Sequence, residues 1–169
     1  MFQNNRMLLT SAAALAAAGT IAVTGLTAAS AAPAAAGASG TQNFQIMSTS
    51  GTARTAKVIA SGLFTASGTD VMGSKVDRLV FKGGSFRVRH SAGKGPQSVN
   101  RKTCLFTSNQ HGTYTIFGGT GSLKGISGHG TYRVSILAVL ARNSHGKCSF
   151  GPAPLGFQQL IRATGSART

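Results

Sequence analysis

Two aspartates are the only acidic side chains in this 169-residue sequence, which contains no Glu. Paired-carboxylate chemistry, in which one carboxyl group gives a proton and another accepts one or attacks, would depend on Asp70 and Asp77 alone. No catalytic residue is assigned, and the candidates are Asp77, Arg78, Tyr114 and Tyr132. Each also has a structural interpretation, Asp77 as the partner of an Arg or a backbone N–H and the tyrosines as core residues with a hydroxyl at the rim.

The two cysteines, Cys104 and Cys148, are predicted to form a disulfide, because an even number of cysteines in an exported chain normally pairs. The bridge would close a loop of about 45 residues and contribute roughly 4 kcal/mol of stability in the chain-entropy model. The alternative is a catalytic or metal-binding thiol. No Cys-x-x-Cys occurs, and His90, His111, His129 and His145 lack the spacing of metal ligands. The sequence therefore predicts neither a metal nor a cofactor.

Basic residues dominate the charge, with 17 Lys and Arg and a formal net charge of +15. Such a charge attracts polyanions over long range. The predicted polyanion-binding residues come from the densest basic stretch and are Lys82, Arg87, Arg89, Lys94, Arg101 and Lys102. A solvated surface that only keeps the protein soluble is the alternative. A specific nucleic-acid reader is not expected, because the motifs are absent and the Tyr and Phe residues fall at core-like positions.

The N-terminal residues 1–31 have the layout of a secretory signal peptide, with Arg6 before an uncharged run over 7–29 and the small-residue site Ala29-Ser30-Ala31. The run is about long enough to cross a bilayer, so a retained anchor is the alternative. Its Ala, Thr, Gly and Ser content and the lack of a basic anchor after it favour cleavage. Residues 32–43 are predicted to be a flexible Ala/Gly leader, and we expect a secreted, extracellular or cell-wall-associated protein without a transmembrane anchor after cleavage.

The elements that would position these residues are strands, because apolar and polar residues alternate and no helical period is sustained. The clearest case is 85–90, with Phe86 and Val88 on one face and Arg87 and Arg89 on the other. About eight antiparallel strands are predicted, at 44–47, 57–65, 75–81, 85–90, 102–108, 112–117, 130–141 and 155–164. The apolar end of 130–141 is expected to be buried on both faces.

Such a set of strands predicts an all-β domain over residues 44–169. Closure into an eight-stranded antiparallel barrel removes the exposed sheet edges. A barrel of this size has an interior just wide enough for side chains or one small ligand. A two-sheet sandwich is the alternative architecture.

A glycine-rich segment over 118–125 superficially looks like a phosphate loop. It matches neither G-x-x-x-x-G-K-[ST] nor G-x-G-x-x-G, and its flanks are predicted strands, so no helix N-terminus would face a phosphate. We expect these glycines to allow positive φ angles and close chain approach at a corner of the barrel.

The same segment resembles the allene oxide cyclase and dirigent-like barrel superfamily, including its small secreted actinobacterial members of unknown function. The matching residues are Gly118, Gly119, Thr120, Gly121, Gly125, Gly128, Gly130 and Tyr132, with supporting matches at 77–81, 84–86 and 102–106. The resemblance covers 44–164 and implies an eight-stranded barrel with an apolar cavity, often in a homo-oligomer. It does not imply cyclase activity, because the plant cyclases depend on a buried Glu that this chain lacks.

We therefore expect a secreted, non-enzymatic β-barrel that binds an anionic cell-surface polymer or a small apolar ligand. A wall-associated structural or toxin-like basic protein has the same sequence features. The alternative is a dirigent- or cyclase-like enzyme that acts on an apolar small molecule in the barrel cavity, a function for which Asp77 would be the acid on a predicted strand.

Overall fold

The structure is a computed structural model that describes residues 37–169. The signal peptide predicted for residues 1–31 lies outside this range, as does the first part of the predicted leader. The first strand, β1 (Ser39–Ser48), starts five positions before the expected barrel boundary at Phe44, because its first residues pair with the end of the last strand.

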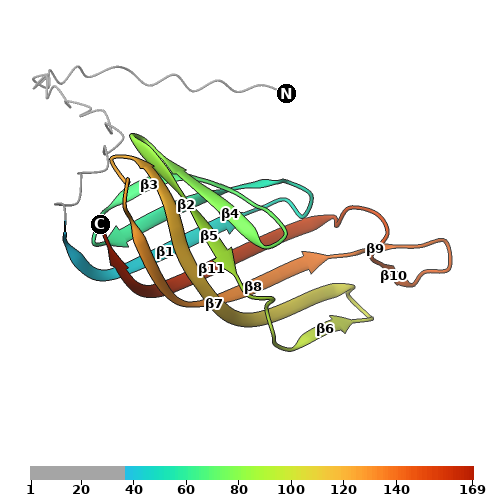
Figure 1. The fold of residues 1–169 in the computed structure, drawn as a ribbon. Coiled ribbons are helices and arrows are strands. Elements are labelled where there is room, and N and C mark those ends of the chain that lie inside the picture. The colour runs from blue at the N-terminus through green and yellow to red at the C-terminus, as the bar shows by residue number, and fades with distance from the viewer. Residues whose placement is uncertain (1–36) are drawn as a thin grey trace, which may run out of the picture.

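The described chain is all-β and forms a closed barrel of eight antiparallel strands (Figure 1). After β1 these strands are β2 (Thr55–Gly62), β3 (Ala66–Val71), β4 (Val76–Phe81), β5 (Gly84–His90), β7 (Leu105–Gly121), β8 (Ser127–Val139) and β11 (Gly156–Arg168). Their order is β5-β4-β3-β2-β1-β11-β8-β7, and pairing of β5 with β7 closes the barrel. The predicted barrel is confirmed, and the sandwich alternative is excluded.

Three short strands lie outside the barrel wall. β6 (Gln97–Asn100) pairs with the first residues of β7 and lies between the strands predicted at 85–90 and 102–108, where no strand was predicted. β9 (Ala141–Arg142) and β10 (Cys148–Ser149) form a small hairpin that projects from one end of the barrel (Figure 1). Cys104 and Cys148 form the predicted disulfide, which ties this hairpin to the start of β7.

The predicted and observed strands of the barrel wall differ in two places. The strand β3 was not predicted, because most of its residues are small or polar. Conversely, the strands predicted at 102–108 and 112–117 fall in the single strand β7, except that residues 102–104 form a turn before it. Gly112 does not break this strand: it lies against the ring of Tyr132, where an added Cβ would be 2.6 Å from the tyrosine hydroxyl oxygen.

The expectation that the apolar end of 130–141 is buried on both faces is wrong. Leu137 and Val139 are 44% and 41% exposed, whereas Ala138 and Leu140 are buried. The wall of the barrel is a single sheet, so among residues 37–169 the core covers its inner face and leaves these outward side chains exposed. The alternation predicted for β5 is confirmed, since Phe86 lies inside and Arg87 and Arg89 are exposed.

The main core fills one end of the barrel with aromatic rings. Phe86 is completely buried, and its ring centroid lies 5.8 Å from that of Phe44, 6.3 Å from Phe64 and 5.7 Å from Phe81. The glycine-rich corner between β7 and β8 closes this end. There Gly121 has a φ of 59°, and an added Cβ would lie 2.0 Å from the carbonyl oxygen of Gly83, so glycine is required where β7 meets the β4–β5 turn.

Candidate functional site

A cavity of about 350 Å³ lies at the other end of the barrel, where the loops after β3 and β5 contribute to its wall. Most of its lining is apolar and comes from inward-facing positions of the strands, including Ile46, Leu79, Val88, Val134 and Ile161. The polar side chains in the lining are Ser74, Asp77, His90, Ser91, Gln110, Tyr114, Tyr132 and Gln159. An apolar cavity with a few convergent polar groups is typical of a small-molecule site.

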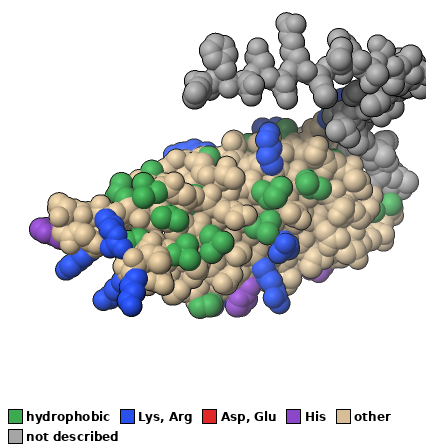
Figure 2. All heavy atoms as spheres, turned by 180° about the vertical axis from the view of Figure 1, so that it is seen from behind, with side chains coloured by type: hydrophobic (Ala, Val, Ile, Leu, Met, Phe, Trp, Pro, Cys, Tyr) green, Lys and Arg blue, Asp and Glu red, His purple; other side chains and the backbone are tan. Residues whose placement is uncertain are grey.

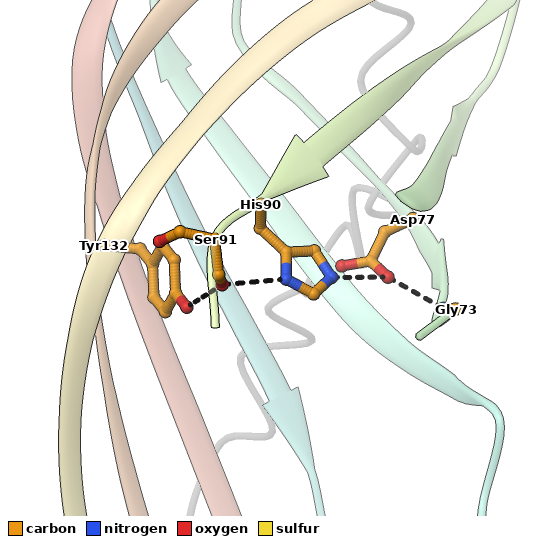
Figure 3. A network of polar contacts seen from close by, with 5 residues as sticks. All are labelled: Gly73, Asp77, His90, Ser91 and Tyr132. Atoms are coloured by element: carbon orange, nitrogen blue, oxygen red, sulfur yellow. Dashed lines mark hydrogen bonds and ion pairs between the residues drawn. The ribbon is translucent and has the colours of Figure 1, made fainter. Parts of the chain in front are cut away.

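Asp77 and His90 face each other across this cavity wall from neighbouring strands (Figure 3). Asp77 Oδ1 accepts a hydrogen bond from the backbone N–H of Gly73 at 2.7 Å and lies 3.5 Å from His90 Nε2. His90 Nδ1 lies 3.3 Å from the carbonyl oxygen of Ser91, which can only accept. This contact therefore places a proton on Nδ1, and a second proton on Nε2 would make the imidazolium partner of Asp77.

Tyr132 extends this network on the other side of His90. Its hydroxyl donates to the same Ser91 carbonyl oxygen at 2.8 Å, and its ring meets the His90 ring edge-on with centroids 6.3 Å apart (Figure 3). The His90 ring is thus held between a carboxylate, a backbone carbonyl and an aromatic ring.

No protein-family model, curated protein or solved structure matches the chain. The site is therefore defined by its geometry. Within residues 37–169, no group of three or more His, Cys, Asp or Glu side chains is placed to hold a metal ion. The same residues include no helix that is long and apolar enough to cross a membrane.

The structure brings three of the four catalytic candidates to the cavity. Asp77, Tyr114 and Tyr132 line it, whereas Arg78 points outward from β4, and its Nε and Nη2 atoms lie 3.3 and 3.2 Å from Ser85 Oγ. Adjacent residues on a strand face opposite sides, so Asp77 and Arg78 cannot both serve the cavity. The earlier interpretation of Asp77 as the partner of a backbone N–H also holds, through Gly73.

Tyr114 carries an unused hydrogen-bonding group. Its side chain is buried, and its hydroxyl has no hydrogen-bond partner among the described residues. Burial raises the pKa of this hydroxyl to about 12, so it is a protonated donor at neutral pH. A buried donor without a partner is costly to the folded state.

Asp70 is a second buried polar group that the sequence did not single out beyond its charge. Its side chain is completely buried, and neither carboxylate oxygen has a hydrogen-bond partner within the described chain. Burial, and secondly the charge of Asp77, raise the pKa of Asp70 to about 7. Asp70 is absent from the cavity lining, so the two aspartates do not form a carboxylate pair that faces a ligand.

His90 is the residue that the sequence reasoning missed although a signal was present. It continues the alternation of Phe86 and Val88 and therefore had to point inward. Gln110 and Gln159 line the cavity as well.

The six predicted polyanion-binding residues do not gather in one cluster. The register distributes them along β7: Arg87 faces Phe117, Arg89 faces Thr115, and Lys94 pairs with His111. Lys82 lies in the β4–β5 turn, and Arg101 and Lys102 precede β7. The guanidinium groups of Arg87 and Arg89 lie 4.9 and 5.1 Å from the centroid of the Phe117 ring.

Proposed function

We propose that the protein is a non-enzymatic binding protein whose barrel holds a small, mostly apolar molecule with a hydrogen-bond acceptor at one end. The observation that carries this proposal is the cavity of about 350 Å³ with apolar walls and the unpartnered Tyr114 hydroxyl. Its volume lies within the range of about 300–1,000 Å³ that is usual for small-ligand sites.

The geometry supports a division of roles within the cavity. Apolar side chains such as Val134 and Ile161 would cover the body of the ligand, and burial of that surface would supply most of the affinity. A small shift of the buried Tyr114 ring would let its hydroxyl donate to the acceptor of the ligand and so end its own unsatisfied state. Asp77 and His90 offer a second polar contact.

Filling the cavity tests this function. A Val134→Trp variant should weaken binding of the neutral fluorescent probe N-phenyl-1-naphthylamine at least tenfold, because the indole occupies the ligand volume. The matched control is Leu137→Trp, which places the same side chain on the outer face of the same strand, where Leu137 is 44% exposed. Absence of probe binding to the parent, or equal affinity in both variants, would contradict the proposal.

A second candidate function is proton transfer on a bound molecule, as in a dirigent- or cyclase-like enzyme. The Asp77–His90 contact favours it, because an imidazole paired with a carboxylate can take up and return a proton next to an apolar site. Turnover of any molecule that binds the cavity should then fall at least 100-fold in His90→Gln and in Asp77→Asn, while probe binding persists. Undiminished turnover in both variants, measured by mass spectrometry of the reaction mixture, would exclude this function.

We further propose that the protein acts outside the cytoplasm and associates with polyanions there. The disulfide supports an oxidising compartment. Both acidic side chains are turned inward, Asp70 fully buried and Asp77 16% exposed at the cavity. On the face seen in Figure 2, Lys, Arg and His side chains stand out and no acidic side chain is visible.

Membership in the allene oxide cyclase and dirigent-like superfamily is likewise a proposal, which the eight-stranded barrel supports.

A further inference from the structure

Four basic side chains lie in one row across the outer face of the barrel. The backbone bridge between Lys94 and His111 places these two residues opposite each other, and the register pairs His111 with Arg133 and Arg133 with Arg162. All four are exposed. The row, here called the cationic row after Lys94, Arg133 and Arg162, runs at right angles to β7, β8 and β11. Register brings its members into line, since they lie far apart in the sequence.

The cationic row lies in a hollow of the outer surface. A groove of about 850 Å³ is lined by His111, Arg133 and Arg162 and by polar residues on either side of them. Those flanking residues, two positions away along the strands, are Thr113 and Thr131 on one side and Asn109 and Ser135 on the other. The cationic side chains are thus bordered by hydroxyl and amide groups that can donate and accept hydrogen bonds.

No described residue neutralises the cationic row. The side chains of Lys94, Arg133 and Arg162 form no hydrogen bond or ion pair within residues 37–169, and both aspartates lie inside the barrel. Like charges placed directly opposite on neighbouring strands repel each other. An external anion bound between Arg133 and Arg162 would therefore relieve the repulsion between their charges. A guanidinium group can bind a carboxylate through two parallel hydrogen bonds.

We propose that the cationic row binds one strand of a carboxylated polysaccharide laid across β7, β8 and β11. Neighbouring strands lie about 4.8 Å apart, a spacing close to the length of one sugar in an extended glycan, so a polymer with one carboxylate per sugar would present one carboxylate to each strand. The flanking Thr, Asn and Ser side chains would bond the sugar hydroxyls. Single-stranded nucleic acid fits less well, because the groove has no exposed Tyr, Phe or Trp ring for base stacking and its one exposed aromatic side chain is the smaller imidazole of His111. This site rests on the proposed association with polyanions and gives it a location and a ligand class.

The test is calorimetric titration of the protein with tetragalacturonate, with maltotetraose as the neutral oligosaccharide and inorganic polyphosphate as the phosphate polymer. The parent should bind tetragalacturonate and not maltotetraose. Arg133→Gln/Arg162→Gln should lower the affinity at least tenfold. The control Arg54→Gln/Lys124→Gln removes the same charge at exposed loop positions and should change the affinity less than threefold.

The other outcomes separate this site from general charge effects. Equal losses in the two double variants, or a larger loss in Arg87→Gln/Arg89→Gln, would overturn the cationic row as the site. Failure of tetragalacturonate to bind while polyphosphate binds would overturn the ligand class but leave the association with polyanions standing. Unchanged binding of N-phenyl-1-naphthylamine in every variant would show that the barrel is folded. It would also show that the substitutions do not change the cavity, so a loss of tetragalacturonate binding belongs to the outer surface.

Discussion

An Asp70→Asn variant is expected to be more stable than the parent at pH 8 and about equally stable at pH 3. The Asp70 carboxyl group is completely buried without a hydrogen-bond partner, and burial raises its pKa from 3.8 to about 7. The folded state therefore holds the Asp70 proton more tightly than the unfolded state does. An amide has the shape of the protonated acid and never ionises, so it escapes the penalty of a buried charge.

The direction of the pH effect follows from proton linkage. Below pH 3.8 the acid is protonated in both states and costs nothing extra. As the pH rises from about 4 to 7, the unfolded chain ionises first, and the folded parent loses stability until the buried carboxyl also ionises. The full difference in pKa corresponds to about 4 kcal/mol above pH 7, and this is the expected gain of the Asn variant there.

Denaturant unfolding of parent and variant at several pH values measures this difference. Asp77→Asn is the matched variant, since it also removes one carboxylate and relieves the smaller cause of the Asp70 shift. The free energy of unfolding of Asp77→Asn should therefore keep most of the pH dependence that Asp70→Asn abolishes. Equal pH dependence in the parent and in Asp70→Asn would mean that Asp70 finds a partner or solvent in solution.

Local alternation was sufficient to predict much of this barrel. The period of two placed Phe86 inside and Arg87 outside, and the count of short strands favoured closure. The same pattern could not reveal β3. Its two buried side chains are Ala66, which is small, and Asp70, a residue type that is typical of turns. A buried carboxylate contradicts the rule that charged groups lie outside, and only tertiary contacts can place it.

The functional surfaces depend on register, which the alternation leaves open. The contact between Asp77 and His90 requires that Asp77 pair with Val88, a register set by the short β4–β5 turn. The cationic row requires two longer connections to align His111, Arg133 and Arg162, residues that are 22 and 29 positions apart along the chain. The density of basic residues in the sequence pointed instead to the stretch from Lys82 to Lys102. In the structure, basic residues that are close in this stretch are spread along β7.

Removal of the disulfide should lower the free energy of unfolding by about 4 kcal/mol in the chain-entropy model. The bridge joins cysteines 44 positions apart and encloses all of β7 and β8, which contribute His111 and Arg133 to the cationic row. Cys104→Ala/Cys148→Ala is the informative variant, because Cys104 is buried in a small separate core with Ala138 and Leu140, where a serine hydroxyl would add a cost of its own.

Removal of the disulfide should lower the free energy of unfolding and leave ligand binding in the cavity unchanged. None of the residues in this small core lines the cavity, so N-phenyl-1-naphthylamine should bind the folded variant within threefold of the parent. Denaturant unfolding measures the stability, and the parent unfolded in the presence of a reductant is the matched control that should show a similar loss. A decrease below about 1 kcal/mol would contradict the expectation, because it would mean that the unfolded chain already holds the β7–β8 hairpin together and that the bridge removes little of its freedom.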